Sequence, residues 1–122
     1  MISVAMTTYN GEKYVKEQLE SILEQTKPVD EIVIMDDKST DETVEIIKKI
    51  QEKSEVKIIL EVNKENVGYI ENFRRAIKKT KGDIIFLCDQ DDVWKKNKMR
   101  EIERVFEDPK VMAVVHDAQI VD

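Results

Sequence analysis

Short apolar runs alternate along the chain with longer stretches in which apolar residues recur at helical spacing. The short runs begin near positions 2, 30, 56, 83 and 111, at intervals of roughly 27 residues. An apolar run this short and bounded by acids, as at 84–88, fits a strand buried on both faces better than a helix. The pattern predicts strands at residues 2–7, 31–35, 56–62, 83–88 and 111–116.

The stretches between these runs are amphipathic, with charged residues opposite an apolar face. The residues predicted to face inward are Val15, Leu19, Ile22 and Leu23; Thr43, Ile46, Ile47 and Ile50; Ile70, Phe73 and Ile77; and Met99, Ile102, Val105 and Phe106. Ser39 and Glu42 have the spacing of a capping box that begins the second helix. We expect the third helix over residues 69–80, with Gly82 as its C-cap, and the fourth over 95–106.

Strands that alternate with helices indicate βαβ units, which build a parallel sheet with helices on both faces. The length of 122 residues corresponds to about one domain, and neither a linker nor a low-complexity segment divides it. We therefore expect residues 1–122 to form one α/β domain with an open, mostly parallel, Rossmann-like sheet.

Composition narrows the class of protein. No apolar run approaches the length of a membrane span and no signal peptide is visible, so we expect a cytoplasmic protein. The net charge of −6 and the lack of a basic stripe argue against nucleic acid as a partner. The single cysteine, Cys88, lies in an apolar run and is expected to be a core residue.

Polar side chains gather at the carboxyl ends of the predicted strands, which is where open parallel sheets bind ligands. They are Thr7, Thr8, Tyr9 and Asn10; Asp36 and Asp37; Asn63, Asn66 and Gly68; and Asp89, Asp91 and Asp92. Paired carboxylates at a strand end are costly without a cation, and Mg²⁺ commonly uses one or two carboxylates plus phosphate oxygens. The Asp-x-Asp-Asp run alone fits a solvated acidic turn equally well, but the convergence favours a metal-bridged phosphate site.

Structural interpretations stay open beside the functional ones. Asp36 or Asp37 could cap a helix, Glu12 could place a charge at a helix N-terminus, and Asn66 and Gly68 could be ordinary turn residues. Tyr9 could be a packing residue, Trp94 could be a hydrophobic residue that orders the loop, and His116 could be purely structural.

Four segments resemble the successive motifs of the family 2 glycosyltransferases. They are 7–15 (Thr-Thr-Tyr-Asn-Gly-Glu-Lys-Tyr-Val), 34–41 (Ile-Met-Asp-Asp-Lys-Ser-Thr-Asp), 66–68 (Asn-Val-Gly) and 89–94 (Asp-Gln-Asp-Asp-Val-Trp). The resemblance implies the GT-A fold and an inverting enzyme that uses nucleotide-diphosphate sugars. The last segment is similar to that of members that build cell-surface polysaccharides, including rhamnosyltransferases.

The resemblance also implies roles for single residues. Thr7, Tyr9 and Asp37 would line the nucleoside pocket, with Asp37 accepting hydrogen bonds from the base. Asp89 and Asp91 would form the D-x-D motif and the metal site for Mg²⁺ or Mn²⁺, with Asp91 the direct ligand and Asp89 nearer the ribose and sugar phosphate. The expected nucleotide-binding set is completed by Asn10, Glu12, Asn66 and Gly68.

Two features depart from the family. Lys96 stands where relatives commonly have a proline, and the sequence ends at Asp122, whereas family members usually run much longer. In those family members the acceptor site and the carboxylate general base lie further along the chain, so the resemblance implies a base beyond Asp122 and none is assigned here. We expect residues 1–122 to be the donor-binding half of a transferase, inactive in sugar transfer by itself.

The expected partners are a UDP- or dTDP-sugar donor and a saccharide or lipid-linked acceptor. Exposed apolar surface where the second half would pack could drive homodimerisation. Peripheral association of the full-length protein with the inner face of the cell membrane is the alternative to a purely cytoplasmic location.

Other function classes compete with this one. A nucleotide-sugar-binding protein without catalysis fits the same motifs. A two-component receiver domain has a similar length and βα order, but its Asp pair follows the first strand, whereas Asp36 and Asp37 follow the second. A nucleotidyltransferase of similar fold is disfavoured, because no glycine- and arginine-rich loop follows the first strand.

Overall fold

The computed structural model describes residues 1–26 and 28–88 of the chain. Within them, four strands alternate with three helices: β1 (Ile2–Thr8), α1 (Val15–Leu23), β2 (Glu31–Asp36), α2 (Thr43–Lys53), β3 (Lys57–Val62), α3 (Tyr69–Lys79) and β4 (Ile84–Cys88). The alternation predicted from the sequence is confirmed over this range. The helix predicted at 95–106 and the strand predicted at 111–116 lie outside the described residues, as do Trp94, Lys96 and His116.

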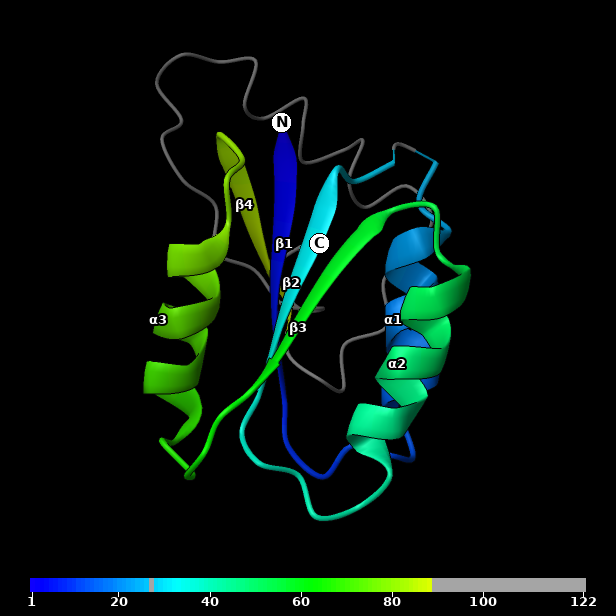
Figure 1. Ribbon diagram of the computed structural model, residues 1–122. Coiled ribbons are helices and arrows are strands. Elements are labelled where there is room, and N and C mark those ends of the chain that lie inside the picture. The colour runs from blue at the N-terminus through cyan, green and yellow to red at the C-terminus, as the bar shows by residue number, and fades with distance from the viewer. Residues whose placement is uncertain (27, 89–122) are drawn as a thin grey trace, which may run out of the picture.

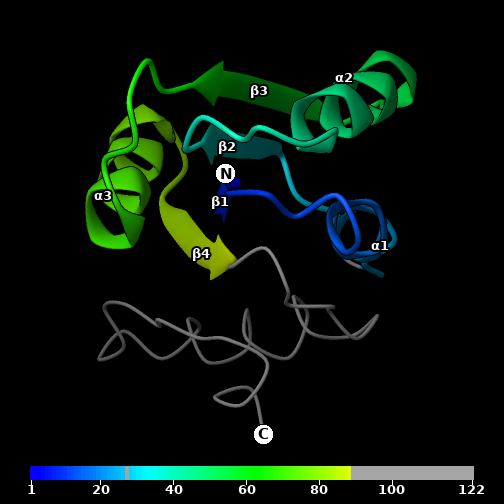
Figure 2. The ribbon, with the colours of Figure 1, turned by 90° about the horizontal axis from the view of Figure 1, so that it is seen from below.

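The strands form one parallel sheet in the order β3-β2-β1-β4. Helices α1 and α2 cover one face and α3 covers the other (Figures 1 and 2). The chain moves outward from β1 to β3, and α3 then returns it across the opposite face to β4, on the other side of β1. This reversal makes the carboxyl ends beside β1 the topological switch point, where open α/β sheets bind ligands. The predicted open parallel α/β sheet is confirmed.

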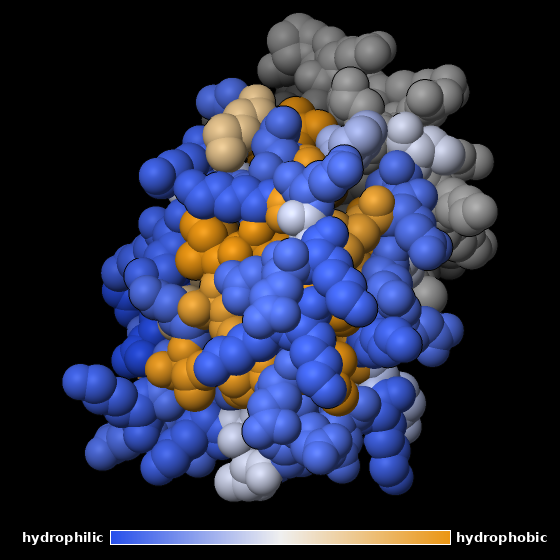
Figure 3. Space-filling model, turned by 45° about the vertical axis from the view of Figure 1, so that its right-hand side comes forward, coloured by the Kyte–Doolittle hydropathy of each residue, from blue (hydrophilic) through white to orange (hydrophobic). Residues whose placement is uncertain are grey.

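Two apolar layers hold the helices to the sheet. The layer under α1 and α2 includes Val4, Met6, Leu19, Ile22, Ile32, Ile34 and Ile47, all fully buried. The layer under α3 is thinner and contains Ala5, Val33, Met35 and Ala76. On the face that Figure 3 shows, hydrophilic residues predominate and apolar atoms are visible between them. Within residues 1–26 and 28–88, no helix combines the length and apolar character needed to cross a membrane.

The strand at 84–88 is buried less evenly than predicted. Phe86 and Cys88 are buried against the layer under α1 and α2, which confirms Cys88 as a core residue. Ile85 and Leu87 pack against the layer under α3 and are only partly buried.

The inward face of α3 differs from the prediction. Ile70 is 82% exposed and Ile77 is 36% exposed, whereas Asn72, Phe73 and Ala76 face the sheet. Asn72 is drawn inward because its side-chain amide donates a hydrogen bond to the carbonyl of Met35 (2.9 Å), so the buried polar group is satisfied. A polar anchor, not the isoleucine spacing, therefore sets the rotation of this helix.

Gly82 is not the C-cap of α3, contrary to the prediction. The helix ends at Lys79, and its C-cap is Thr80, which has an extended backbone (ψ 148°). Gly82 instead lies against the amino end of β1, where a Cβ atom would be 2.5 Å from Ser3 Oγ and 2.7 Å from the carbonyl oxygen of Met1. The sequence needs glycine here because the chain passes too close to β1 for any side chain.

Glu31 binds the connection between α3 and β4 to the amino edge of the sheet. Its carboxylate is fully buried and accepts hydrogen bonds from Ser3 Oγ and from the Lys81 N–H, each at 2.6 Å. Ser3 Oγ in turn accepts the Gly82 N–H (2.9 Å). This network aligns the amino ends of β1, β2 and β4, so their carboxyl ends also lie at one edge.

The close approach of Gly82 predicts that Gly82→Ala lowers stability. Because the obstructing atoms include backbone, we expect a loss of about 1–3 kcal/mol in unfolding free energy, measured by urea denaturation. The matched control is Lys81→Ala, an exposed neighbour whose backbone N–H is retained, for which the change should stay within about 0.5 kcal/mol. Equal stability of the two variants would contradict the packing argument.

Candidate functional site

A cavity of about 420 Å³ opens at the carboxyl ends of β1 and β2, beside the first turn of α3. Its walls are Thr7, Thr8, Tyr9, Asp37, Asn66, Gly68, Tyr69 and Asn72. Five of these were expected in the site from the sequence: Thr7, Tyr9, Asp37, Asn66 and Gly68. The parallel topology therefore gathers residues from three separate segments of the chain around one opening.

Asp37 is the anchor of this cavity. Its Oδ1 accepts hydrogen bonds from the Val67 N–H (2.8 Å) and from Asn63 Nδ2 (3.0 Å), and its Oδ2 accepts the Gly68 N–H (3.1 Å). The carbonyl of Asp37 accepts a further bond from the Asn66 amide. One residue at the end of β2 thus fixes the whole loop that leads into α3.

The charge of Asp37 is stabilised although the residue is only 8% exposed. Burial by itself raises the pKa of this carboxyl, but the hydrogen bonds from Val67, Asn63 and Gly68 outweigh it and hold the pKa below the ordinary value of 3.8. Asp37 is therefore an ionised acceptor at neutral pH. A negative group next to the first turn of α3 also suits the dipole of that helix.

Gly68 allows the loop to meet Asp37. Its backbone lies at φ 86° and ψ 164°, a region that essentially only glycine occupies. A Cβ atom at this position would contact nothing within 4 Å, so the requirement for glycine comes from the backbone angle and not from crowding.

Two tyrosines flank the opening. Tyr9 follows β1 and is 47% exposed, and Tyr69 begins α3 and is 59% exposed. Tyr69 packs edge to face on Phe73, with ring centroids 5.0 Å apart and an interplanar angle of 82°. Exposed aromatic faces on a polar cavity are suited to a planar ligand that also needs hydrogen bonds.

Asn10 and Glu12, both expected to bind nucleotide, do not line this cavity. Asn10 adopts a left-handed backbone (φ 48°), in keeping with the Asn-Gly turn, and its Oδ1 accepts the Thr40 N–H (2.8 Å). Glu12 Oε2 accepts the Glu42 N–H (3.1 Å), next to the start of α2. Both residues join the loop after β1 to the loop after β2. The sequence suggested a helix-terminal charge for Glu12, and the structure places that charge at α2.

The capping box predicted for α2 is absent. Ser39 turns back instead, donating through its hydroxyl to Asp36 Oδ1 (2.6 Å) and through its N–H to Asp36 Oδ2 (2.7 Å). Asp41 accepts the Thr43 N–H (2.9 Å) at the beginning of the helix. Lys38, with φ 61°, makes the tight turn that lets Ser39 reach Asp36. Asp36 binds Thr8 and Ser39, and Asp37 binds the loop that leads into α3, so neither carboxylate caps α2.

The metal ligands expected from the sequence, Asp89 and Asp91, lie outside the described residues. Strand β4 ends at Cys88, which is paired with Met6 one residue before the cavity residue Thr7, so the described chain stops beside the cavity. Among residues 1–26 and 28–88, no three His, Cys, Asp or Glu side chains are grouped so as to hold a metal ion.

Three cavity residues and one supporting residue were not assigned from the sequence: Thr8, Tyr69, Asn72 and Asn63. Thr8 and Asn63 were both among the polar residues at the predicted strand ends, which is a signal that could have identified them. Tyr69 directly follows Gly68, so the turn geometry at this glycine could have pointed to it. Asn72 was hidden inside a helix whose apolar spacing suggested a different inward face.

Comparison with known proteins establishes the class. The family model described as "Glycosyl transferase family 2" matches residues 3–120, nearly the whole chain. The chain therefore belongs to glycosyltransferase family 2, and its fold is of the GT-A type. The resemblance inferred from the four motifs is confirmed.

Individual relatives agree with this family. The chain is 46% identical over 101 residues to dTDP-rhamnosyl transferase RfbG of Shigella flexneri, covering 78% of this chain and 34% of the relative. It is 35% identical over 123 residues to an uncharacterized glycosyltransferase of Nostoc, covering 99% of this chain and 37% of the relative. The chain thus spans about a third of the length of the curated relatives that it matches.

Solved structures show the same architecture. A mannosyltransferase from Pyrobaculum calidifontis, in complex with GDP-Man and Mn²⁺, superposes with a TM-score of 0.85 and 27% identity over 90% of this chain and 33% of that chain. TarS of Staphylococcus aureus, in complex with UDP-GlcNAc, gives 0.79 and 30% over 87% of this chain and 31% of that chain.

The lowered pKa of Asp37 predicts how stability depends on pH. A carboxylate whose pKa is depressed by folding contributes stability above its unfolded value, and loses it as the pH falls through the folded value. Asp37→Asn should therefore be less stable than the wild type by about 2 kcal/mol at pH 7. The difference should shrink below about pH 4, in urea denaturation at a series of pH values.

The control for this experiment is Asp83→Asn, which changes a carboxylate whose side chain is 90% exposed at the amino edge of the sheet. Its effect at pH 7 should stay within about 0.5 kcal/mol. A difference between wild type and Asp37→Asn that is as large at pH 3.5 as at pH 7 would show that the ionised form is not what the loop stabilises.

Proposed function

We propose that this chain is the donor-binding part of a metal-dependent, inverting glycosyltransferase. Its donor is a nucleotide-diphosphate sugar, most simply a UDP- or dTDP-sugar, and its acceptor is a saccharide or a lipid-linked saccharide of a cell-surface polysaccharide. The observation that carries this proposal is the cavity at the switch point, which gathers Thr7, Tyr9 and Asp37 around one opening. Relatives whose names specify sugar transfer, such as the dTDP-rhamnosyl transferase, support it.

In this proposal, the described residues bind the nucleoside. A planar base lies against the exposed tyrosines, and the ionised carboxylate of Asp37 accepts a hydrogen bond from a base N–H. Thr7, Asn66 and Gly68 complete the wall around the base. Because most of these groups are already held by the protein, the pocket needs little rearrangement to take the donor.

Asp91 and Asp89 follow the last described strand and are the proposed ligands of Mg²⁺ or Mn²⁺. Carboxylate oxygens suit either ion, and the mannosyltransferase with a similar fold binds Mn²⁺ together with GDP-Man. If bound there, such an ion would stabilise the negative charge of the departing nucleotide diphosphate. The acceptor hydroxyl would attack the anomeric carbon in line and invert it, with its proton removed by a carboxylate base assigned to sequence beyond Asp122.

The remaining proposals concern the whole protein. Residues 1–122 are the donor-binding portion of a longer fold, and the full-length protein works in the cytoplasm or at the inner face of the membrane. A homodimer formed through exposed apolar surface is proposed on the exposure of Ile70. A nucleotide-sugar-binding protein without catalysis is the second candidate, because the cavity around Asp37 by itself supports binding of a nucleoside.

The proposal predicts metal-dependent nucleotide binding with little sugar transfer by residues 1–122. Calorimetry should show that UDP or dTDP binds more tightly with Mn²⁺ or Mg²⁺ than without. Asp91→Ala should remove this enhancement, which is expected to be on the order of tenfold or more because the ion neutralises the diphosphate. The control is Asp83→Ala, at the opposite edge of the sheet, which should bind as the wild type does. A nucleotide affinity that changes neither on adding the metal ion nor in Asp91→Ala would refute the proposal.

A further inference from the structure

Asn63, at the end of β3, connects the cavity to a second hollow on the other side of the loop. The residue is only 6% exposed. Its Nδ2 donates to Asp37 Oδ1 (3.0 Å) and to Asn72 Oδ1 (2.7 Å), and its Oδ1 accepts a hydrogen bond from Arg75 Nη1 (3.2 Å). The amide therefore lies between an anion on one side and a cation on the other.

The chemistry of the neighbours allows only one orientation of this amide. Arg75 can only donate, and an ionised Asp37 can only accept. Asn72 uses its own amide nitrogen on the carbonyl of Met35 (2.9 Å), so it presents its oxygen to Asn63. If the Asn63 amide were reversed, its oxygen would face two acceptors and its nitrogen would face a guanidinium, so every one of these contacts would be lost.

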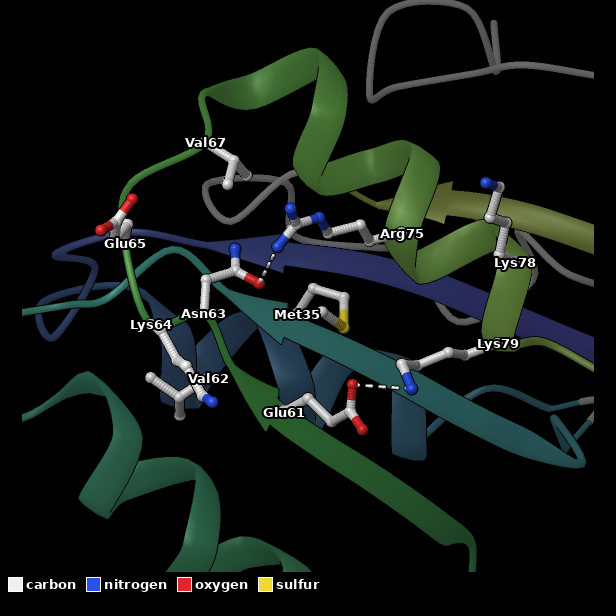
Figure 4. Close-up of a pocket in the computed structure, with 10 residues that line it drawn as sticks. All are labelled: Met35, Glu61, Val62, Asn63, Lys64, Glu65, Val67, Arg75, Lys78 and Lys79. Carbon is white, nitrogen blue, oxygen red and sulfur yellow. Dashed lines mark hydrogen bonds and ion pairs between the residues drawn. The ribbon is translucent and has the colours of Figure 1, made fainter.

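Arg75 stands outside the nucleoside cavity. It lines the second hollow, of about 930 Å³, between α3 and β3, and Figure 4 shows its guanidinium reaching from α3 to Asn63. Its Nε donates to Glu71 Oε2 (3.2 Å). That hydrogen bond is the main cause that lowers the pKa of Glu71, so Glu71 is an anion at neutral pH and holds Arg75 in place. Arg75 is thus itself positioned, although it does not line the cavity around Asp37.

The consequence concerns the direction of the Asp37 carboxylate. Among the residues that the structure describes, Val67 and Asn63 donate to Asp37 Oδ1, whereas Gly68 donates to Oδ2. A carboxylate has about four acceptor sites, so Oδ2 retains capacity for a donor from the cavity. Without the Asn63 amide, the carboxylate could rotate. The N–H groups of Val67 and Gly68 would then bind its two oxygens in a different arrangement.

We propose that Arg75 and Asn63 are positioning residues, which orient the Asp37 carboxylate so that Oδ2 reads a ring N–H of the donor's base. This inference rests on the proposed function. It identifies the preferred base class as uracil, thymine or guanine, each of which carries a ring N–H. It also assigns to Arg75 an effect on base recognition without contact with the nucleotide.

A purely structural role for Arg75 makes a different prediction, and a methylated base separates the two. Calorimetry would compare the best-binding diphosphate among UDP, dTDP and GDP with its analogue methylated at the ring N–H. Methylation removes the donor that Asp37 reads but keeps the ribose, the diphosphate and the metal contacts. The wild type should prefer the unmethylated ligand by roughly tenfold, since the acceptor is charged.

Arg75→Met should reduce this preference to about twofold, mainly by weakening the unmethylated ligand. The matched control is Arg74→Met, its neighbour on α3, which also pairs with Glu71 (3.3 Å), whereas the bond to Asn63 comes from Arg75. This control should keep the full preference. Arg75→Lys retains the charge but lacks the planar fork, and should recover part of the preference. If Arg75→Met melts at a lower temperature than Arg74→Met, Arg75→Lys takes its place as the test variant.

The outcomes are distinct. A preference that falls in Arg75→Met and persists in Arg74→Met supports the inference. Equal weakening of both ligands in Arg75→Met, or a wild type that does not distinguish them, overturns it and leaves nucleotide binding intact. If the wild type binds none of the three diphosphates with Mn²⁺ or Mg²⁺, the proposed function itself fails, and the positioning role fails with it.

Discussion

The carboxylate of Asp37 is the interaction on which the candidate site depends. Asp37 directly follows β2, and its carboxylate accepts two backbone N–H groups, from Val67 and Gly68, together with the amide of Asn63. A buried backbone N–H group that loses its acceptor destabilises the fold. The loop into α3 therefore stays bound to Asp37, because any other position would leave the N–H groups of Val67 and Gly68 without a partner. A single anion therefore joins the end of β2, the end of β3 and the start of α3.

The same network explains why α3 lies as it does. The helix meets the sheet through small residues, Ala5 and Ala76, and through the polar anchor Asn72. These contacts turn Tyr69 to the rim of the cavity and leave Ile70 exposed. The contacts that stabilise the helix thus also shape the cavity. A substitution that alters the packing of α3 should therefore alter the shape of the cavity.

The two ends of the sheet are fastened by different chemistry. At the amino edge, the buried Glu31 binds Ser3 and Lys81, and atoms of Met1 and Ser3 leave no room for a side chain at Gly82. At the carboxyl edge, the loops after β1 and β2 are joined through Asn10 and Glu12, which keeps them at the rim without placing either side chain in the cavity. Membership of glycosyltransferase family 2 is consistent with this division, since the ligand edge belongs to the carboxyl ends of the strands.

The sequence by itself determined the alternating α/β order, the parallel sheet and the family, because period, spacing and motif order are local or linear properties of the chain. It also pointed to Thr7, Tyr9 and Asp37, since strand ends are visible in the pattern. It did not reveal the inward face of α3, the role of Gly82 or the place of Asn10 and Glu12. Those depend on which groups meet across the fold. Asn72 is buried because its side chain forms hydrogen bonds with Met35 and Asn63, and Gly82 is required because β1 passes beside it. The Asn63 amide, which Arg75 contacts, donates to Asp37. Hydrogen-bond partners distant in sequence decide such details, and only the tertiary structure brings them together.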